Sequence, residues 1–307
     1  HNILEAGAHY TDSPWRTANN INNVGFPEPV PYAGDKRIFM AEQFYDVSHP
    51  VRRELHRAYI RQCLDNFKGN TGVIQLISAE YTGPLHFVEF WIDVIKEWKT
   101  ETGLQPIIGL STTKDVQDAI LADAERAKEI QVIDIRYWYY QKNGEAYAAE
   151  GGKNLAPRQH ARQLKSTGTS AEQVYRAVSE YRTKFPDKAV VYHSTSYPEY
   201  AWAAFMAGGS MANIPKVAHS GFTKDASGMR AKSGGEIWLL EGKESAIIYS
   251  PYNTVSEVDI PAWKGNYKAY HIDTKTGEIL GSERVKTGQR VTLKKYKKPA
   301  VVWITNK

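Results

Sequence analysis

The chain of 307 residues lacks several features that assign proteins to familiar classes. Its one cysteine, Cys63, excludes an internal disulfide framework and a cysteine-rich zinc site, and its helical surroundings indicate a buried structural thiol. No apolar run reaches the roughly 20 residues that a membrane-spanning helix needs, and no glycine-rich phosphate loop is present. We therefore expect a globular protein with no membrane span, no nucleotide and no other cofactor.

Positive charge exceeds negative charge by only five, and the excess lies at one end of the chain. Residues 232–307 hold 13 basic and 8 acidic residues, which accounts for the whole net charge of +5. Residues 1–231 are balanced, whereas a nucleic-acid enzyme would carry positive charge around its catalytic half. No nucleic-acid partner is therefore expected.

Four apolar segments, each followed by a helical pattern, recur along the first two thirds of the chain. They are residues 73–78, 106–110, 132–136 and 189–193. Apolar side chains recur between them at helical spacing, in Phe87, Phe90, Trp91, Val94, Ile95 and Trp98 and in Val116, Ala119, Ile120, Ala127 and Ile130. Ser170 and Gln173 form a capping-box start for a further helix. This alternation predicts an α/β fold with a parallel sheet and crossover helices.

An earlier strand at residues 2–8 and a last unit at residues 200–207 bring the count to about six of the eight units of a (β/α)8 TIM barrel. Residues 1–226 are therefore predicted to form a partial barrel whose first two strands are missing. Because an open barrel exposes sheet edges, we expect the missing N-terminal segment from a longer chain or from a separate chain. Residues 11–50 show no regular period, which predicts a long loop that walls the site.

The pattern changes after residue 226. Residues 228–235 are rich in Gly, Ser and Lys and are predicted to form a linker. Residues 232–307 then contain short alternating strands separated by turn pairs such as Thr276–Gly277, which predicts a small antiparallel β-sandwich.

Glu80 is the strongest catalytic candidate, because it ends an apolar strand and precedes an amphipathic helix. In a parallel barrel that position lies at the carboxyl rim, where catalytic groups are placed. A carboxylic acid there suits protonation of a glycosidic oxygen, although it could instead cap the helix or pair with an arginine. Aromatic and polar residues follow other strands and are predicted to bind the sugar substrate: Arg136, Tyr137, Trp138 and Ser194, with His9, Tyr10 and Trp15.

The motif SAEYTG at residues 78–83, with FVEFWIDVIKEW after it, resembles the fourth strand and helix of retaining clan-A barrel glycoside hydrolases. The segment KAVVYHSTSYPEYAWAAFMAGGS, residues 188–210, is similar to their seventh strand and last unit. The chain resembles, among these, bacterial polysaccharide-degrading enzymes in which the barrel is followed by a β-sandwich described as a collagen-binding domain. The resemblance implies that Glu80 is the acid/base. Ala79 stands where the family has Asn, and Ser194 stands at the nucleophile position.

A serine is a weak glycosyl nucleophile without activation, so the second catalytic group is open. Candidates are His193 as a base, Glu199, and the carboxylates of Glu5, Asp12, Glu42, Asp46 and Asp134, of which Asp134 could instead pair with Arg136. Asp46, His49 and His9 have no recognised metal-ligand spacing, so no metal is predicted. The prediction is an extracytoplasmic glycoside hydrolase acting on a plant or algal polysaccharide. The alternatives are elimination chemistry, a catalytically lapsed carbohydrate-binding protein and an adhesion protein.

Overall fold

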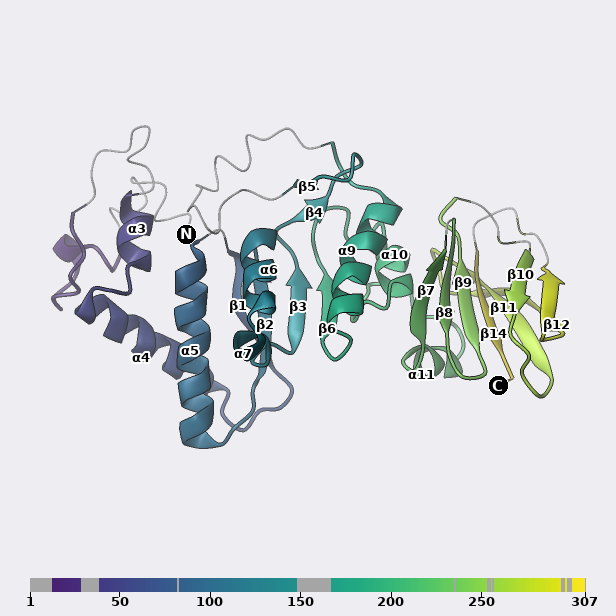
Figure 1. Ribbon diagram of the computed structural model, residues 1–307, viewed down its shortest axis with the longest axis horizontal. Coiled ribbons are helices and arrows are strands. Elements are labelled where there is room, and N and C mark those ends of the chain that lie inside the picture. Colours follow the sequence, from purple (N-terminus) through teal and green to yellow (C-terminus); the bar gives the residue numbers. More distant parts are fainter. Residues whose placement is uncertain are drawn as a thin grey trace. The chain divides into compact units, whose positions relative to one another are not determined.

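The computed structural model describes residues 13–28, 39–81, 83–147, 167–234, 236–252, 255, 257–293, 296 and 300–306. The chain divides into two compact units, His1–Gly168 and Thr169–Lys307, and most of their elements are labelled in Figure 1. The predicted strand at residues 2–8 lies outside the described residues, as do His9, Tyr10, Glu5 and Asp12. The predicted boundary near residues 226–232 was placed where the strand type changes, and it stays a prediction.

The first unit alternates strands and helices in the predicted order. Its elements are η1 (Thr17–Asn19), α3 (Phe39–Tyr45), α4 (Pro50–Asn66), β1 (Ile74–Tyr81), α5 (Leu85–Thr102), β2 (Ile107–Thr112), α6 (Lys114–Ala122), α7 (Ala124–Ala127), β3 (Val132–Ile135), β4 (Tyr139–Tyr140) and β5 (Ala146–Tyr147). The presence of η1 and α3 corrects the prediction of a structureless loop over residues 11–50, because local helical turns form within it.

The strands β1, β2 and β3 pair in parallel and in chain order. Their first shared positions are Ile74 opposite Ile107 and Gly109 opposite Val132. Connections between parallel strands need a crossover, and α5 and α6 provide it. The parallel α/β arrangement predicted from hydrophobic periodicity is therefore confirmed for this part of the chain. Among the described residues no closed barrel forms.

Helix α5 shows why the spacing of its apolar residues predicted a helix. Five of the six predicted positions are buried, and the sixth, Trp91, is half-buried. The helix ends at Gly103, which adopts φ 70° and so closes the last turn in the left-handed conformation that glycine tolerates best. The second predicted run, residues 116–130, is not one helix. Asp123 ends α6 and caps α7 through the backbone N–H groups of Glu125 and Arg126.

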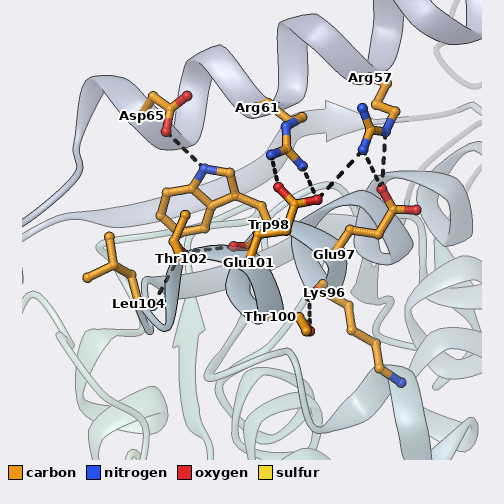
Figure 2. A network of polar contacts seen from close by, with 10 residues as sticks. All are labelled: Arg57, Arg61, Asp65, Lys96, Glu97, Trp98, Thr100, Glu101, Thr102 and Leu104. Carbon is orange, nitrogen blue, oxygen red and sulfur yellow. Dashed lines mark hydrogen bonds and ion pairs between the residues drawn. The ribbon is translucent and has the colours of Figure 1, made fainter.

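Polar contacts join α4 to α5 (Figure 2). Arg57 lies 3.1 Å from Glu97, and Arg61 pairs with Glu101. Nearby, the indole N–H of Trp98 donates to Asp65 Oδ1 at 2.9 Å. The four ion-pairing side chains are partly exposed, so solvent screening keeps their contribution small. The apolar residues that pack between the two helices therefore contribute most to their alignment.

The second unit begins with α/β elements and ends with antiparallel strands. Its elements are α9 (Ala171–Lys184), β6 (Ala189–Tyr192), α10 (Ala201–Met206), α11 (Gly221–Ala226), β7 (Arg230–Gly234), β8 (Ile237–Glu241), β9 (Ala246–Tyr249), β10 (Glu257–Ile260), β11 (Tyr267–Asp273), β12 (Ile279–Val285), β13 (Gln289–Thr292) and β14 (Ala300–Thr305). The predicted cap of α9 is confirmed, because the Ser170 hydroxyl accepts from the backbone N–H of Gln173.

Six strands form one antiparallel sheet in the order β12-β11-β14-β9-β8-β7, and β10 and β13 form a two-stranded ribbon. A cluster of buried residues joins the sheet to the ribbon: Ile248, Val255, Ile260, Tyr267, Ala269, Val285, Val291, Leu293, Val302 and Ile304. The predicted linker is corrected here, because Arg230–Gly234 forms strand β7 and pairs with β8. Its Gly and Ser content had argued against a strand, but the neighbouring strand supplies its hydrogen-bond partners.

Helices of the same unit pack on the opposite face of the six-stranded sheet. Trp303 lies between two cluster residues in sequence and therefore faces the other way, where its indole N–H donates to Asp225 Oδ2 at 2.9 Å. The Tyr175 and Trp238 rings stack at 4.7 Å, and Trp202 Nε1 donates to the Thr274 carbonyl oxygen at 2.8 Å. These contacts explain why the last α/β elements belong to the same compact unit as the sheet.

Over the described residues, no helix has the length and apolarity needed to span a membrane.

Candidate functional site

The carboxyl end of β1 carries a bulge that contains the predicted acid. Ile77 pairs with Leu110 and Tyr81 pairs with Thr112, so residues 78–80 of β1 oppose a single residue of β2. Ser78 opens the bulge with φ 63°, a left-handed conformation that is uncommon for a residue other than glycine. Bulges and strained backbone positions concentrate next to active sites, where they redirect side chains. The backbone of Glu80 lies in this bulge, whereas its side chain is outside the description.

Tyr81 anchors the bulge to the start of α5. Its buried hydroxyl donates to the Pro84 carbonyl oxygen at 2.9 Å, and its ring contacts the Tyr45 ring edge-on at 5.8 Å. Burial and the neighbouring Tyr45 raise the pKa of Tyr81 well above its usual value, so the phenol stays protonated and acts as a donor. Glycine is required at Gly83, because a Cβ there would lie 2.5 Å from the Tyr81 ring.

Polar residues also lie at the ends of β2 and β3. Ser111 and Thr112 have no exposed surface, and within the described structure the Ser111 hydroxyl has no hydrogen-bond partner. Asp134 is buried and accepts from Arg136 Nε at 2.8 Å. The pairing of Asp134 with Arg136, the structural alternative for that carboxylate, is therefore confirmed. Since Leu110 pairs with Ile133, the next residues, Ser111 and Asp134, follow at adjacent positions on the two strands.

Gln117 of α6 ties these strand ends together and was not among the predicted site residues. Its side-chain N–H groups donate to the carbonyl oxygens of Leu110 at 3.0 Å and Asp134 at 3.2 Å. Its Oε1 accepts from the Trp138 indole N–H at 2.8 Å. Gln117 is fully buried, and the sequence signal for this role was a polar residue within the apolar spacing of Val116 and Ile120.

The structure corrects the interpretation of the aromatic run after β3. The strand ends at Ile135, and Tyr139–Tyr140 form the separate strand β4, so strict alternation does not continue through the run. Trp138 has no exposed surface, and the Lys114 ammonium lies 4.8 Å above its ring. Because its ring is buried, Trp138 supports the ends of the strands from inside and is not accessible to a sugar. Arg136 and Tyr137 are half-buried and keep part of their surface.

Trp15 lies in an aromatic cluster. Its ring contacts Phe26 at 5.8 Å, Phe44 at 6.0 Å and His56 at 6.4 Å. His56 is buried with Nε2 2.7 Å from the Phe44 carbonyl oxygen, and burial lowers the pKa of its imidazole. The half-buried Trp15 also lines an apolar cavity of about 540 Å³ bounded by α4, α5 and β1.

The predicted residues His193, Ser194 and Glu199 belong to the second unit and lie in the loop after β6. The His193 ring meets Tyr197 edge-on at 5.0 Å, and the Ser194 carbonyl oxygen accepts from the Tyr197 backbone N–H at 3.2 Å. Glu199 is exposed. Burial raises the pKa of Tyr200, and the neighbouring Glu199 carboxylate raises it further by charge and by a hydrogen bond.

Of the remaining acidic candidates that the structure describes in the first unit, Asp46 has structural partners and Glu42 is exposed to solvent. A hydrogen bond from Ser48 lowers the pKa of Asp46, and Arg52 lies 3.7 Å from it. His49 caps α4 by accepting from the Arg52 backbone N–H, and Glu42 is exposed on α3. Within the described ranges, no group of three His, Cys, Asp or Glu side chains is arranged to hold a metal ion.

A family model described as "Domain of unknown function (DUF6298)" matches residues 1–229. The chain belongs to the DUF6298 family. The match ends one residue before β7 begins and covers both the β1 bulge and the loop after β6. No curated protein matches this DUF6298 chain.

Solved structures similar to the DUF6298 chain are glycoside hydrolases. One, a glycoside hydrolase family 5 protein from Bacteroides vulgatus ATCC 8482, shares 12% identity with a TM-score of 0.50, covering 81% of this chain and 66% of that one. A second, described as a glycoside hydrolase, shares 14% identity with a TM-score of 0.50, covering 93% of this chain and 79% of that one. The chain thus spans 66% of the length of the first. At these identities the likeness shows a glycoside hydrolase-like fold alone.

Proposed function

We propose that the chain is a glycoside hydrolase domain in which Glu80 is the general acid. The observation that carries the proposal is the bulge at residues 78–80, which interrupts a parallel strand at its carboxyl end. A strained backbone needs a structural reason to persist, and presenting a catalytic side chain is a common one. The similarity of the fold to glycoside hydrolases supports the same assignment.

The proposal includes the finer features that the sequence predicted. The parallel α/β part is a (β/α)8 barrel whose front segment comes from a longer or separate chain, and residues 232–307 form a β-sandwich. The substrate is a plant or algal polysaccharide, and because such a polymer does not cross a membrane, the protein acts outside the cytoplasm. Arg136, Tyr137, Ser194, His9, Tyr10 and Trp15 are proposed contacts for the sugar, and His193 and Glu199 are proposed catalytic groups beside Glu80.

The test compares Glu80→Gln with the wild type on a panel of polysaccharides and on matched nitrophenyl glycosides. A poor sugar leaving group needs protonation, so hydrolysis of the polymer should fall by about 100-fold or more. A nitrophenolate leaves with little protonation, so hydrolysis of the activated glycoside should fall much less. Glu54→Gln, a matched change at an exposed glutamate of α4, should leave both rates unchanged.

Equal loss on both substrates, or near-normal hydrolysis of the polymer, would remove Glu80 from the acid role. The second candidate function is carbohydrate binding without catalysis, which is favoured by Ser194 at the position where a nucleophile is expected. Calorimetric binding of an oligosaccharide that wild-type protein never cleaves would select this function.

A further inference from the structure

The second unit contains a cavity of about 500 Å³ that the proposed function does not use. Its walls come from the last turns of α9 and α10, the segment 208–217, helix α11 and strand β8, which all belong to this one unit. Cavities that bind small molecules commonly have volumes of roughly 300–1,000 Å³. The cavity is therefore large enough to hold a sugar ring or a molecule of similar size.

The cavity lies beside the amino end of β6, whereas the predicted catalytic residues of this unit follow the carboxyl end of the same strand. Arg182, which lines the cavity, donates a hydrogen bond from Nη1 to the carbonyl oxygen of Lys188, directly before β6. Ser210, also in the wall, donates its backbone N–H to the Val190 carbonyl oxygen at 2.7 Å. Because the two regions flank opposite ends of one strand, a ligand in the cavity is separate from the substrate of the proposed active site.

The charged side chains in the wall of this cavity are cations. Among the described residues, Arg182 and Lys216 line the cavity and no acidic side chain does. Within the described contacts, the hydrogen bonds of the Arg182 guanidinium both start from Nη1 and end on the carbonyl oxygens of Pro186 and Lys188. These bonds fix the guanidinium and leave its other edge, formed by Nε and Nη2, for a ligand. Two parallel N–H donors on one edge match the two oxygens of a carboxylate.

The glycine at position 208 leaves this edge of Arg182 uncovered. Gly208 adopts φ 80°, and a Cβ there would lie 3.6 Å from Arg182 Nε. A Cβ at the next residue, Gly209, would lie 2.6 Å from the Ala204 carbonyl oxygen, so both positions of this turn favour glycine. Met211 continues the wall with a φ of 54°, and its side chain is 69% exposed. Strained backbone positions of this kind concentrate at ligand-binding sites.

The rest of the wall combines apolar side chains with hydroxyl groups, as a sugar ring requires. These residues are Phe205, Ile214 and Pro215 and the hydroxyl-bearing Ser210, Thr223 and Ser227. We propose that the cavity is a second carbohydrate site, which binds a hexuronate unit. The uronate carboxylate lies on the Nε–Nη2 edge of Arg182 and near the Lys216 ammonium. The apolar side chains contact the ring carbons, and the hydroxyl groups bond to the sugar hydroxyls. This binding goes beyond the proposed hydrolysis and does not depend on Glu80.

The test is calorimetric titration of the full-length chain with glucuronate and galacturonate. Glucose and galactose are the neutral matched sugars, and acetate and inorganic phosphate are anions without a sugar ring. At least one uronate should bind at least about tenfold more tightly than its neutral sugar and than either anion, because it alone uses both the charge and the ring surface.

Variants locate the bound sugar. Arg182→Lys keeps the charge but removes the two-donor edge, so it should weaken uronate binding by about tenfold or more. Lys216→Gln should weaken it by about threefold, and added salt should reduce that difference. Lys224→Gln, a matched change at an exposed lysine of α11 outside the cavity wall, should leave the affinity unchanged. Hydrogen exchange over residues 171–192 checks that each variant is folded, and the exposed Lys216 provides an independent test if Arg182→Lys does not fold.

Three outcomes would overturn the proposal. Binding of acetate or phosphate as tight as that of the uronates would show a general anion site. Uronate affinity that the folded Arg182 and Lys216 variants leave unchanged would place the sugar elsewhere on the chain. Failure of both uronates to bind at millimolar concentrations would equally reject a hexuronate site.

Discussion

Replacement of Gln117 by Met tests how the ends of β2 and β3 are held. Met matches the length of Gln and keeps the site filled, but it removes every polar partner that Gln117 supplies. The indole N–H of Trp138 and the carbonyl oxygens of Leu110 and Asp134 each lose one hydrogen bond inside the protein. None of these groups can turn to water, because Gln117 and Trp138 have no exposed surface.

The expected loss follows from the cost of leaving buried polar groups without partners. Each such group costs about 1–3 kcal/mol, and the indole N–H loses the bond of 2.8 Å that it donates to Gln117 Oε1. The two carbonyl oxygens lose less, since each has a second lone pair. Together these terms predict that Gln117→Met lowers the free energy of unfolding of the first unit by roughly 2–5 kcal/mol.

The assay is unfolding in urea, monitored by hydrogen exchange over residues 107–140. This segment reports the stability of the first unit separately. Gln62→Met is the matched control, because Gln62 is exposed and its side chain bonds only Asn66 in the described contacts. Its effect should stay within about 0.5 kcal/mol. In a double-mutant cycle, Trp138→Phe removes the stranded donor, so part of the loss should disappear, with a coupling of about 1–2 kcal/mol. A loss below that of the control would refute the role of Gln117.

Three further outcomes are expected. Burial lowers the pKa of His56 below its ordinary value near 6.5, so below pH 6.5 the unfolded chain binds more protons than the folded protein. The free energy of unfolding should therefore fall as the pH drops below 6.5, by up to about 1.4 kcal/mol per pH unit. His56→Gln should flatten this pH dependence in thermal melts. Gly277→Ala should destabilise the second unit by more than about 1 kcal/mol, because a Cβ there would collide with the Lys216 carbonyl, whereas Gly103→Ala, with a similar φ and open space, should cost about 1 kcal/mol or less. Arg61→Ala should change stability by at most about 1 kcal/mol, and 1 M salt should reduce the effect; a larger, salt-independent loss would contradict a surface ion pair.

Some parts of the candidate site could be predicted from the sequence, and others could not. The position of Glu80 at the end of β1 followed from an apolar run ended by an acid, because strand and helix periods are local properties. The burial of Trp138 could not be predicted in the same way, since it depends on Gln117, which lies 21 residues earlier in the chain. The bulge at residues 78–80 likewise depends on pairing with β2, which comes about 30 residues later.

The sequence by itself determined the helical face of α5, the cap at Ser170, and the change from alternating strands and helices to antiparallel strands. These features depend on side chains three or four positions apart, or two apart in a strand, and such spacings are readable in one dimension. Only the tertiary structure decided that residues 230–234 form a strand, that Asp134 pairs with Arg136, and that α4, α5 and β1 leave an apolar cavity. Each of these depends on which distant segments come together, because a backbone group or a charge is satisfied by its neighbours in space.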